Sequence, residues 1–183
     1  FSNVSFRYPG SETYALRNFS LKLNVGEKLA VVGRNGSGKT TMIKLLCRLY
    51  DPDEGEILVN GVNIRKFRRE EYIKLFSVVF QDFHLFSLML AENVATSTEY
   101  EEGRVERCLE DAGFGERLAK LKRESEGICS YLYKDFSDSG VEISGGEAQK
   151  IAIARAVYRK ASFVLLDEPT AALDPLAEAE IYS

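Results

Sequence analysis

The chain has 183 residues, of which 45% are hydrophobic, so it can bury one substantial core and is long enough for one domain with a small insertion. Its net charge is −4, from 24 basic and 28 acidic residues, and neither sign forms the block that marks a nucleic-acid-binding surface. Three scattered cysteines argue against a disulfide framework and favour a reducing compartment, and no apolar run approaches the roughly 18 residues of a membrane-spanning helix.

The first 32 residues alternate between apolar and polar side chains, which predicts half-buried strands. Val4, Phe6 and Tyr8 form the first such series. Residues 29–32 are instead a continuous apolar run that ends at Gly33, and this pattern predicts a buried central strand of a parallel sheet.

A glycine-rich loop follows this run, because residues 33–40 read GRNGSGKT and match the pattern G-x-x-x-x-G-K-[ST]. Glycines allow backbone N–H groups to approach phosphate oxygens, and the helix predicted over residues 42–49 adds the positive end of its dipole. Lys39 is expected to reach the terminal phosphates and Thr40 to ligate Mg²⁺. The alternative is an ordinary glycine-rich turn with a solvated lysine. The predicted phosphate-binding residues are Gly33, Asn35, Gly36, Ser37, Gly38, Lys39, Thr40 and Thr41.

The middle of the chain first predicts strands and then helices. Asn60-Gly61 indicates a hairpin turn between strands at residues 56–59 and 62–64, and residues 77–80 indicate another strand. From about residue 85 to 138 the periodicity becomes helical, with helices expected over residues 101–112 and 115–122. We interpret this region as a helical insertion.

A second buried strand is predicted over residues 163–166, and Asp167 and Glu168 follow it directly. Open α/β sheets bind ligands at the carboxyl ends of their strands. Asp167 is therefore expected to hold Mg²⁺, and Glu168 to polarise a water for attack on the terminal phosphate. Taken alone, such a pair is more often a helix cap or a solvated strand end, and the phosphate-binding loop favours the catalytic role.

Ser144, Gly145, Gly146 and Glu147 precede a buried helix predicted over residues 148–157. A serine and two glycines at a helix start form a potential second anion site. On these residues alone, an ordinary helix N-cap is the more common explanation.

Together these motifs resemble the nucleotide-binding domain of ABC transporters, over essentially the whole chain. They are a Walker A loop at residues 33–41, a glutamine at Gln81, ISGGE at 143–147, FVLLDE at 163–168 and ALD at 172–174. The resemblance implies an α/β fold of the P-loop NTPase class, with a RecA-like core, an antiparallel β subdomain and a helical subdomain. It implies a single domain over residues 1–183, with β-subdomain strands in about 1–32 and 53–80, a helical subdomain in about 85–142, and the core in 29–50 and 148–183.

The resemblance also implies that two such domains pair head to tail around ATP and Mg²⁺. Ser144, Gly145 and Gly146 would then bind the ATP that is held by the Walker A loop of the second domain. The implied catalytic residues are Glu168, Lys39 and Gln81, and the implied magnesium ligands are Thr40, Gln81 and Asp167.

Two further roles follow from the likeness, and each has a structural alternative. Tyr8 would stack on adenine, and the alternative from the sequence alone is a strand aromatic in the core. Asp174 resembles an aspartate near the dimer seam, although the Asp-Pro pair also suits a plain helix cap.

Residues 81–95 resemble the segment that exporters present to the coupling helices of their membrane domains. His84, Phe86 and Leu88 are candidates for this contact, and the alternative is that the apolar ones fill the helical subdomain. His84 is the only histidine, and nothing near it suggests a metal site. The sequence departs from the family pattern at Ile143 and Glu147, which replace the usual leucine and glutamine, and in residues 138–142.

The main hypothesis is therefore the ATP-binding and ATP-hydrolysing domain of an ABC exporter at the cytoplasmic face of the cell membrane. Its expected partners are a second nucleotide-binding domain, identical or different, and a transmembrane domain, fused or separate, with no nucleic acid. We interpret the sequence as truncated at both ends. The family's switch histidine would lie beyond residue 183, so we expect the chain alone to bind ATP but to hydrolyse it poorly.

Two alternatives remain open from the residues. A soluble ABC-type ATPase that acts in DNA maintenance or translation is disfavoured, because the stretch between Gly38 and Val141 is too short for a long coiled coil. A degenerate regulatory half-site is disfavoured because Glu168 and the signature serine and glycines are present.

Overall fold

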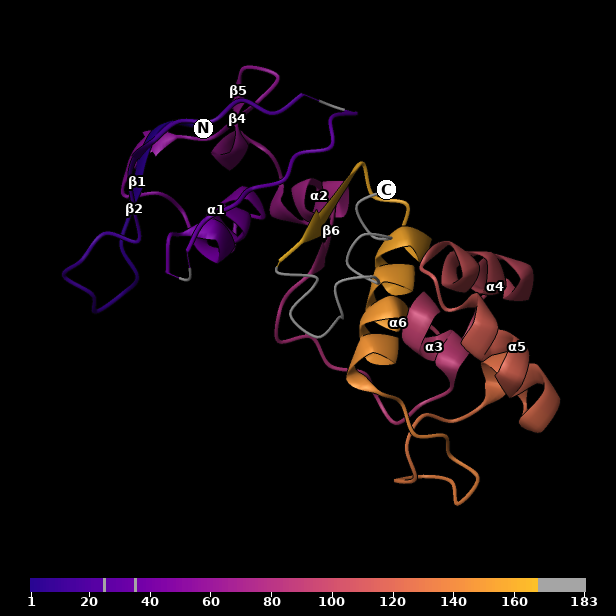
Figure 1. Cartoon of the computed structure of the whole chain (residues 1–183). Helices are drawn as coiled ribbons and strands as arrows, with labels where there is room; N and C mark the ends of the chain where they lie inside the picture. Colours follow the sequence, from indigo (N-terminus) through magenta and orange to yellow (C-terminus); the bar gives the residue numbers. More distant parts are fainter. Residues whose placement is uncertain (25, 35, 168–183) are drawn as a thin grey trace. The chain divides into compact units, whose positions relative to one another are not determined.

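The computed structural model describes residues 1–24, 26–34 and 36–167. The chain divides into two compact units, Phe1–Phe76 and Ser77–Ser183, and Figure 1 labels their α-helices and most of their strands.

The first unit contains a three-stranded antiparallel sheet in the order β2-β1-β3. Its strands are β1 (Ser2–Phe6), β2 (Leu16–Phe19) and β3 (Glu54–Glu56). Gly55 of β3 must be a glycine because β1 lies very close to it. Its φ is +76°, and an added Cβ would lie 2.3 Å from the carbonyl oxygen of Asn3.

The predicted hairpin at Asn60-Gly61 is confirmed. β4 (Leu58–Val59) pairs with β5 (Val62–Asn63) in antiparallel register. Both turn residues have positive φ, 49° at Asn60 and 78° at Gly61, as the preferred two-residue hairpin turn requires.

The predicted helix after the glycine-rich loop is confirmed as α1 (Lys39–Leu46), in which Met42, Ile43 and Leu45 are buried. The predicted buried strand over residues 29–32 is wrong. These residues carry no strand, and the exposed fractions of Leu29 and Val32 are 53% and 92%. A continuous apolar run creates a preference for β structure, but a strand also needs hydrogen-bonding neighbours, and the described strands β1 to β5 pair among themselves.

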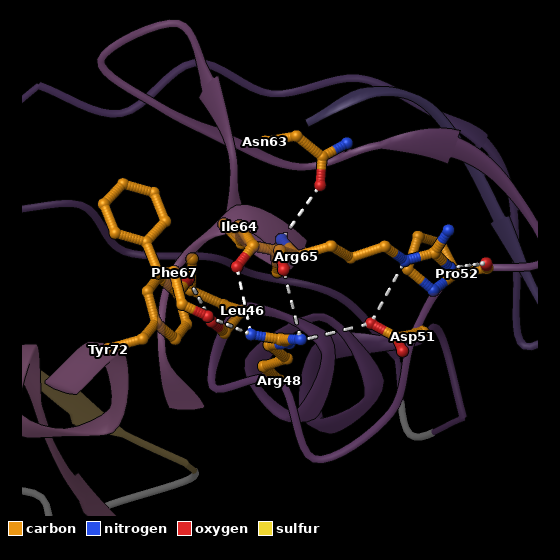
Figure 2. Close-up of polar contacts among 9 residues, drawn as sticks. All are labelled: Leu46, Arg48, Asp51, Pro52, Asn63, Ile64, Arg65, Phe67 and Tyr72. Atoms are coloured by element: carbon orange, nitrogen blue, oxygen red, sulfur yellow. Dashed lines mark hydrogen bonds and ion pairs between the residues drawn. The ribbon is translucent and has the colours of Figure 1, made fainter. Parts of the chain in front are cut away.

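Past the end of α1, Arg48 is the centre of a polar network, which Figure 2 shows in close-up. One guanidinium nitrogen donates to the carbonyls of Ile64, at 3.1 Å, and Phe67, at 2.9 Å. These carbonyls lie at the start of η1 (Ile64–Lys66) and just past its end. Asp51 adds an acidic partner, with its Oδ1 3.3 Å from Nε of Arg65 and 4.0 Å from Nε of Arg48. The network ties the end of α1 to the segment that follows the hairpin.

Tyr72, at the end of α2 (Arg69–Tyr72), makes a second tie to α1. Its hydroxyl donates to the carbonyl of Leu46 at 2.6 Å (Figure 2), and its side chain is buried. Burial raises the pKa of Tyr72, so the hydroxyl stays a donor at neutral pH.

Replacing Arg48 with alanine is expected to lower the free energy of unfolding by roughly 1–3 kcal/mol, because partly buried carbonyls lose their donor. Arg48→Lys should recover only part of this loss, because an ammonium lacks the planar fork of donors. Urea unfolding followed by circular dichroism measures the change. Arg68, which forms an exposed ion pair with Glu71, is the control, and its alanine variant should change stability by less than about 0.5 kcal/mol. Equal effects at the two sites would contradict the prediction.

The second unit contains a two-stranded sheet and a helical cluster. β6 (Phe76–Val79), whose first residue belongs to the first unit, is hydrogen-bonded to β7 (Phe163–Leu166), so strands are present where residues 77–80 and 163–166 predict them. The predicted burial of residues 163–166 is wrong, because the side chains of β7 are partly exposed and Val164 is 47% exposed. The helices of this unit are α3 (Leu90–Ala95), α4 (Glu102–Asp111), α5 (Gly115–Glu124) and α6 (Gly145–Tyr158), with η3 (Gly127–Cys129) after α5; η2 (Ile73–Leu75), just before β6, belongs to the first unit.

The helices predicted over residues 101–112, 115–122 and 148–157 correspond to α4, α5 and α6. Figure 1 shows α3 and α4 beside α6, and α5 contacts α4 and η3. Ile151 and Ala154 of α6 are fully buried in one core together with Leu109 of α4 and Leu118 of α5. Among the residues described, none of the helices has the length and hydropathy needed to cross a membrane.

Candidate functional site

The predicted site residues fall in both units. Tyr8 and the glycine-rich loop belong to the first unit, and Gln81, the serine and glycines before α6, and Asp167 belong to the second. Asn35, Glu168 and Asp174 lie outside the described residues.

The glycines of the loop are required by its geometry. Gly38 has φ +95°, and an added Cβ would lie 2.6 Å from Cδ2 of Leu16 and 2.8 Å from the carbonyl oxygen of Ala15. At Gly33 an added Cβ would lie 2.6 Å from Oγ of Ser37. A side chain at Gly38 would force the loop to open, because it would meet a backbone carbonyl, whereas a side chain at Gly33 would displace the hydroxyl of Ser37.

The loop leads into α1 without a side-chain cap in the part of the chain described, because its N-cap residue is Gly38. The first intrahelical bond runs from the N–H of Met42 to the carbonyl of Gly38, at 2.9 Å. Nζ of Lys39 folds back over the loop and donates to the carbonyls of Gly33, at 2.8 Å, and Arg34, at 3.2 Å. Thr40 lies half-buried in the first turn. A helix N-terminus, an ammonium group and a hydroxyl in one loop match the needs of a magnesium-bound triphosphate.

The structure brings Tyr8 and Thr41 together, with Tyr8 Oη 3.1 Å from Oγ1 of Thr41. The ring of Tyr8 meets Phe6 and Tyr50 edge to face, with centroids 5.1 and 5.4 Å away. Nζ of Lys44 lies 5.8 Å from the centroid of Tyr8. The ring is half-buried, so it is partly a core aromatic and partly accessible beside the first turn of α1.

In the second unit, Gln81 and Asp167 follow two strands that end side by side. The backbone N–H of Asp167 donates to the carbonyl of Val79, the last residue of β6, at 2.9 Å. Gln81 is exposed two residues beyond Val79, and Asp167 directly follows β7 and is 4% exposed. An amide oxygen and a carboxylate at one edge of the sheet are oxygen ligands of the kind that Mg²⁺ prefers.

At the start of α6, Ser144 is the N-cap and forms a capping box with Glu147. Its Oγ accepts from the N–H of Glu147 at 3.3 Å, and Oε2 of Glu147 accepts from the N–H of Ser144 at 2.9 Å. The capping box does not use the N–H groups of Gly145 and Gly146. The hydroxyl of Ser144 accepts a bond in the capping box, so its own proton remains available to a ligand.

Sequence reasoning missed Arg155 of α6, which joins this helix to the segment after Gln81. Its Nε donates to the carbonyl of Asn93 at 2.7 Å, and a terminal nitrogen donates to the carbonyl of His84 at 3.3 Å. Burial lowers the pKa of Arg155 from its ordinary value. Asn93 in turn accepts from the N–H of Phe86 at 2.9 Å. No sequence spacing could reveal these contacts, because their partners are far apart along the chain.

Comparisons with known proteins identify the family. The family model described as ABC transporter matches residues 16–171. The chain is 39% identical to subtilin transport ATP-binding protein SpaT of Bacillus subtilis, over 100% of this chain and 30% of the relative. It is also 39% identical to the ATP-dependent lipid A-core flippase of Escherichia coli K12, over 99% of this chain and 30% of the relative.

Among solved structures, the chain resembles a bacterial Atm1-family ABC exporter with ATP bound. The TM-score is 0.85 and the identity 31%, over 99% of this chain and 31% of the exporter chain. The chain thus spans about a third of the length of the relatives that it matches. The chain belongs to the ABC transporter family and has a P-loop NTPase fold of mixed sheets and helices.

Proposed function

We propose that the chain is the ATP-binding and ATP-hydrolysing domain of an ABC exporter. The observation that carries the proposal is the glycine-rich loop that leads into the uncapped start of α1, with Nζ of Lys39 folded over it. A loop of this pattern at a helix N-terminus binds the phosphates of a nucleotide through its backbone N–H groups. The relatives support the exporter class, because their names describe transport ATP-binding proteins and an ATP-dependent flippase.

Within this proposal, the fold consists of a RecA-like core, an antiparallel β subdomain and a helical subdomain. The three-stranded sheet of the first unit supports the β subdomain, and α3, α4 and α5 support the helical one. The proposed boundaries are those expected from the sequence, with a helical subdomain at about residues 85–142.

The residues of the loop would bind the phosphates of ATP. Backbone N–H groups and the ammonium of Lys39 would neutralise the terminal phosphates, and the accessible part of Tyr8 would stack on adenine. Mg²⁺, when bound, would stabilise charge on the phosphate oxygens. Thr40, Gln81 and Asp167 would hold that ion. Glu168 would orient the attacking water and accept its proton.

Ser144, Gly145 and Gly146 would act on the nucleotide of a second domain. Their free donors support this, because the capping box uses the N–H groups of Ser144 and Glu147 and leaves those of the two glycines. Two domains, identical or different, would pair head to tail, so that each ATP lies between a glycine-rich loop and the start of an α6 helix.

A transmembrane domain, fused or separate, would contact residues 81–95 at the cytoplasmic face of the cell membrane. Phe86 and Leu88 are 59% and 42% exposed, and His84 is also exposed. Exposed apolar side chains support a contact surface and argue against a role of these two residues in the core of the second unit. Nδ2 of Asn93 holds this segment, because it donates to the carbonyls of Phe86, at 2.9 Å, and Leu88, at 3.4 Å.

The test is ATP hydrolysis by the complete protein that carries this chain, purified in detergent and then returned to lipid vesicles. MgATP hydrolysis that changes on reconstitution is the expected result, because membrane coupling alters the conformation of the domain. Absence of hydrolysis in both settings would contradict the proposal. Salt-sensitive binding to nucleic acid without any effect of lipid would point instead to a soluble ABC-type ATPase.

A further inference from the structure

Arg117 of α5 lies beside the start of α6 and contacts the chain on both sides of Ser144. Its Nε is 3.0 Å from Oε1 of Glu147, and a terminal nitrogen donates to the carbonyl of Glu142 at 3.2 Å. The side chains of Arg117 and Glu147 are only 25% and 28% exposed. An ion pair with this degree of shielding is less screened by salt than one on the open surface.

Both carboxylate oxygens of Glu147 therefore have partners. Oε2 accepts from the N–H of Ser144 at 2.9 Å, and Oε1 faces Arg117. The contact with Arg117 is an ion pair without a hydrogen bond from Nε, so the N–H of Ser144 orients the carboxylate and the charge of Arg117 attracts it to the same place. Arg117 thus holds Glu147 in the capping box.

The charge of Glu147 makes this arrangement important for an anionic ligand. A carboxylate in the first turn stabilises a helix, but the same charge repels a phosphate that approaches that N-terminus. A glutamine would complete the same capping box without the repulsion. Arg117 supplies the compensating positive charge at 3.0 Å.

We propose that Arg117 is a positioning residue for the start of α6, because it holds Glu147 in the capping box and neutralises its charge. The donors of Ser144, Gly145 and Gly146 then face the triphosphate of a second domain, and Arg117 offsets the repulsion from the Glu147 carboxylate. The inference rests on the proposed function, since it concerns the same nucleotide site.

The experiment compares ATP hydrolysis by four variants of the complete protein: Arg117→Ala, Arg117→Lys, Glu147→Gln and the double variant Arg117→Ala with Glu147→Gln. Arg117→Ala should raise the KM for ATP by about three- to tenfold, the effect of one uncompensated charge in a partly shielded site. Its kcat should change by less than about twofold, because ground state and transition state lose the same interaction. Arg117→Lys should recover part of the loss.

The double variant gives the decisive comparison. Glu147→Gln should keep a KM close to that of the wild type, and the double variant should match Glu147→Gln, because without the carboxylate there is no charge to neutralise. The control is Arg107→Ala, which removes an arginine from an exposed ion pair with Glu101 at 3.3 Å and should leave KM unchanged.

Two results would overturn the inference. One is a wild-type KM in Arg117→Ala, which together with a lowered melting temperature would show a structural role only. The other is a double variant as impaired as Arg117→Ala. An absence of ATP hydrolysis in the wild type would overturn the proposed function itself, and the inference with it.

Discussion

Replacing Lys39 with alanine is expected to lower the kcat for ATP hydrolysis by at least about a hundredfold and to weaken nucleotide binding by about tenfold or more. The ammonium of Lys39 lies against the carbonyls of Gly33 and Arg34, so it is already held at the loop where phosphates would bind. Alanine removes the positive charge from the first residue of α1. Steady-state hydrolysis and equilibrium binding of a fluorescent ATP analogue measure the two effects.

The fold should tolerate this substitution, because the bonds from Lys39 to the loop carbonyls are exposed to solvent. The melting temperature is therefore expected to stay within a few degrees of that of the wild type. Lys120, in an exposed ion pair with Glu124, is the matched control, and its alanine variant should hydrolyse ATP normally. Full hydrolysis by Lys39→Ala would show that Lys39 and its loop are not part of the nucleotide site.

Replacing Glu168 with glutamine is expected to lower hydrolysis by about a hundred- to ten-thousandfold while nucleotide binding persists. The substitution removes the proposed base and keeps the size of the side chain, and it leaves the sequence of the loop and Asp167 unchanged. ATP should then accumulate between two domains. Light scattering on a sizing column, applied to a purified domain that carries this chain and the substitution, should show a doubled mass only when ATP is present.

Asp167→Asn provides the comparison for this variant. Asp167 is buried at the end of β7, and its loss should weaken the dependence of nucleotide binding on Mg²⁺, which Glu168→Gln should leave intact. Unchanged turnover in Glu168→Gln would show that another group activates the water. A persistent monomer that still binds ATP would indicate pairing with a different chain or a need for the membrane domain.

Some features of this protein could be read from neighbouring residues in the chain. The hairpin at Asn60-Gly61 and the helix after the glycine-rich loop depend on local backbone preferences, and both are present. The same is true of the helix after Ser144, whose cap needs only a hydroxyl and a carboxylate three residues apart. Family membership followed from the order of such motifs.

The strand predicted over residues 29–32 shows where local reasoning ends. Its apolar residues prefer a buried sheet, yet Val32 is 92% exposed and the segment carries no strand. Strand formation depends on partners from elsewhere in the chain, and the composition of one segment cannot specify them.

By itself, the sequence determined the hairpin turn, the helices and the chemical groups of the candidate site, because helix caps, turns and phosphate loops are built from residues close together in the chain. Only the tertiary structure decided which distant groups hold those elements in place. Arg48 reaches the carbonyls past the hairpin, Arg155 reaches Asn93, and Arg117 reaches Glu147. The physical reason is that the packing of helices and strands decides which acceptors lie within reach of a long arginine side chain. The spacing of residues along the chain does not specify that packing.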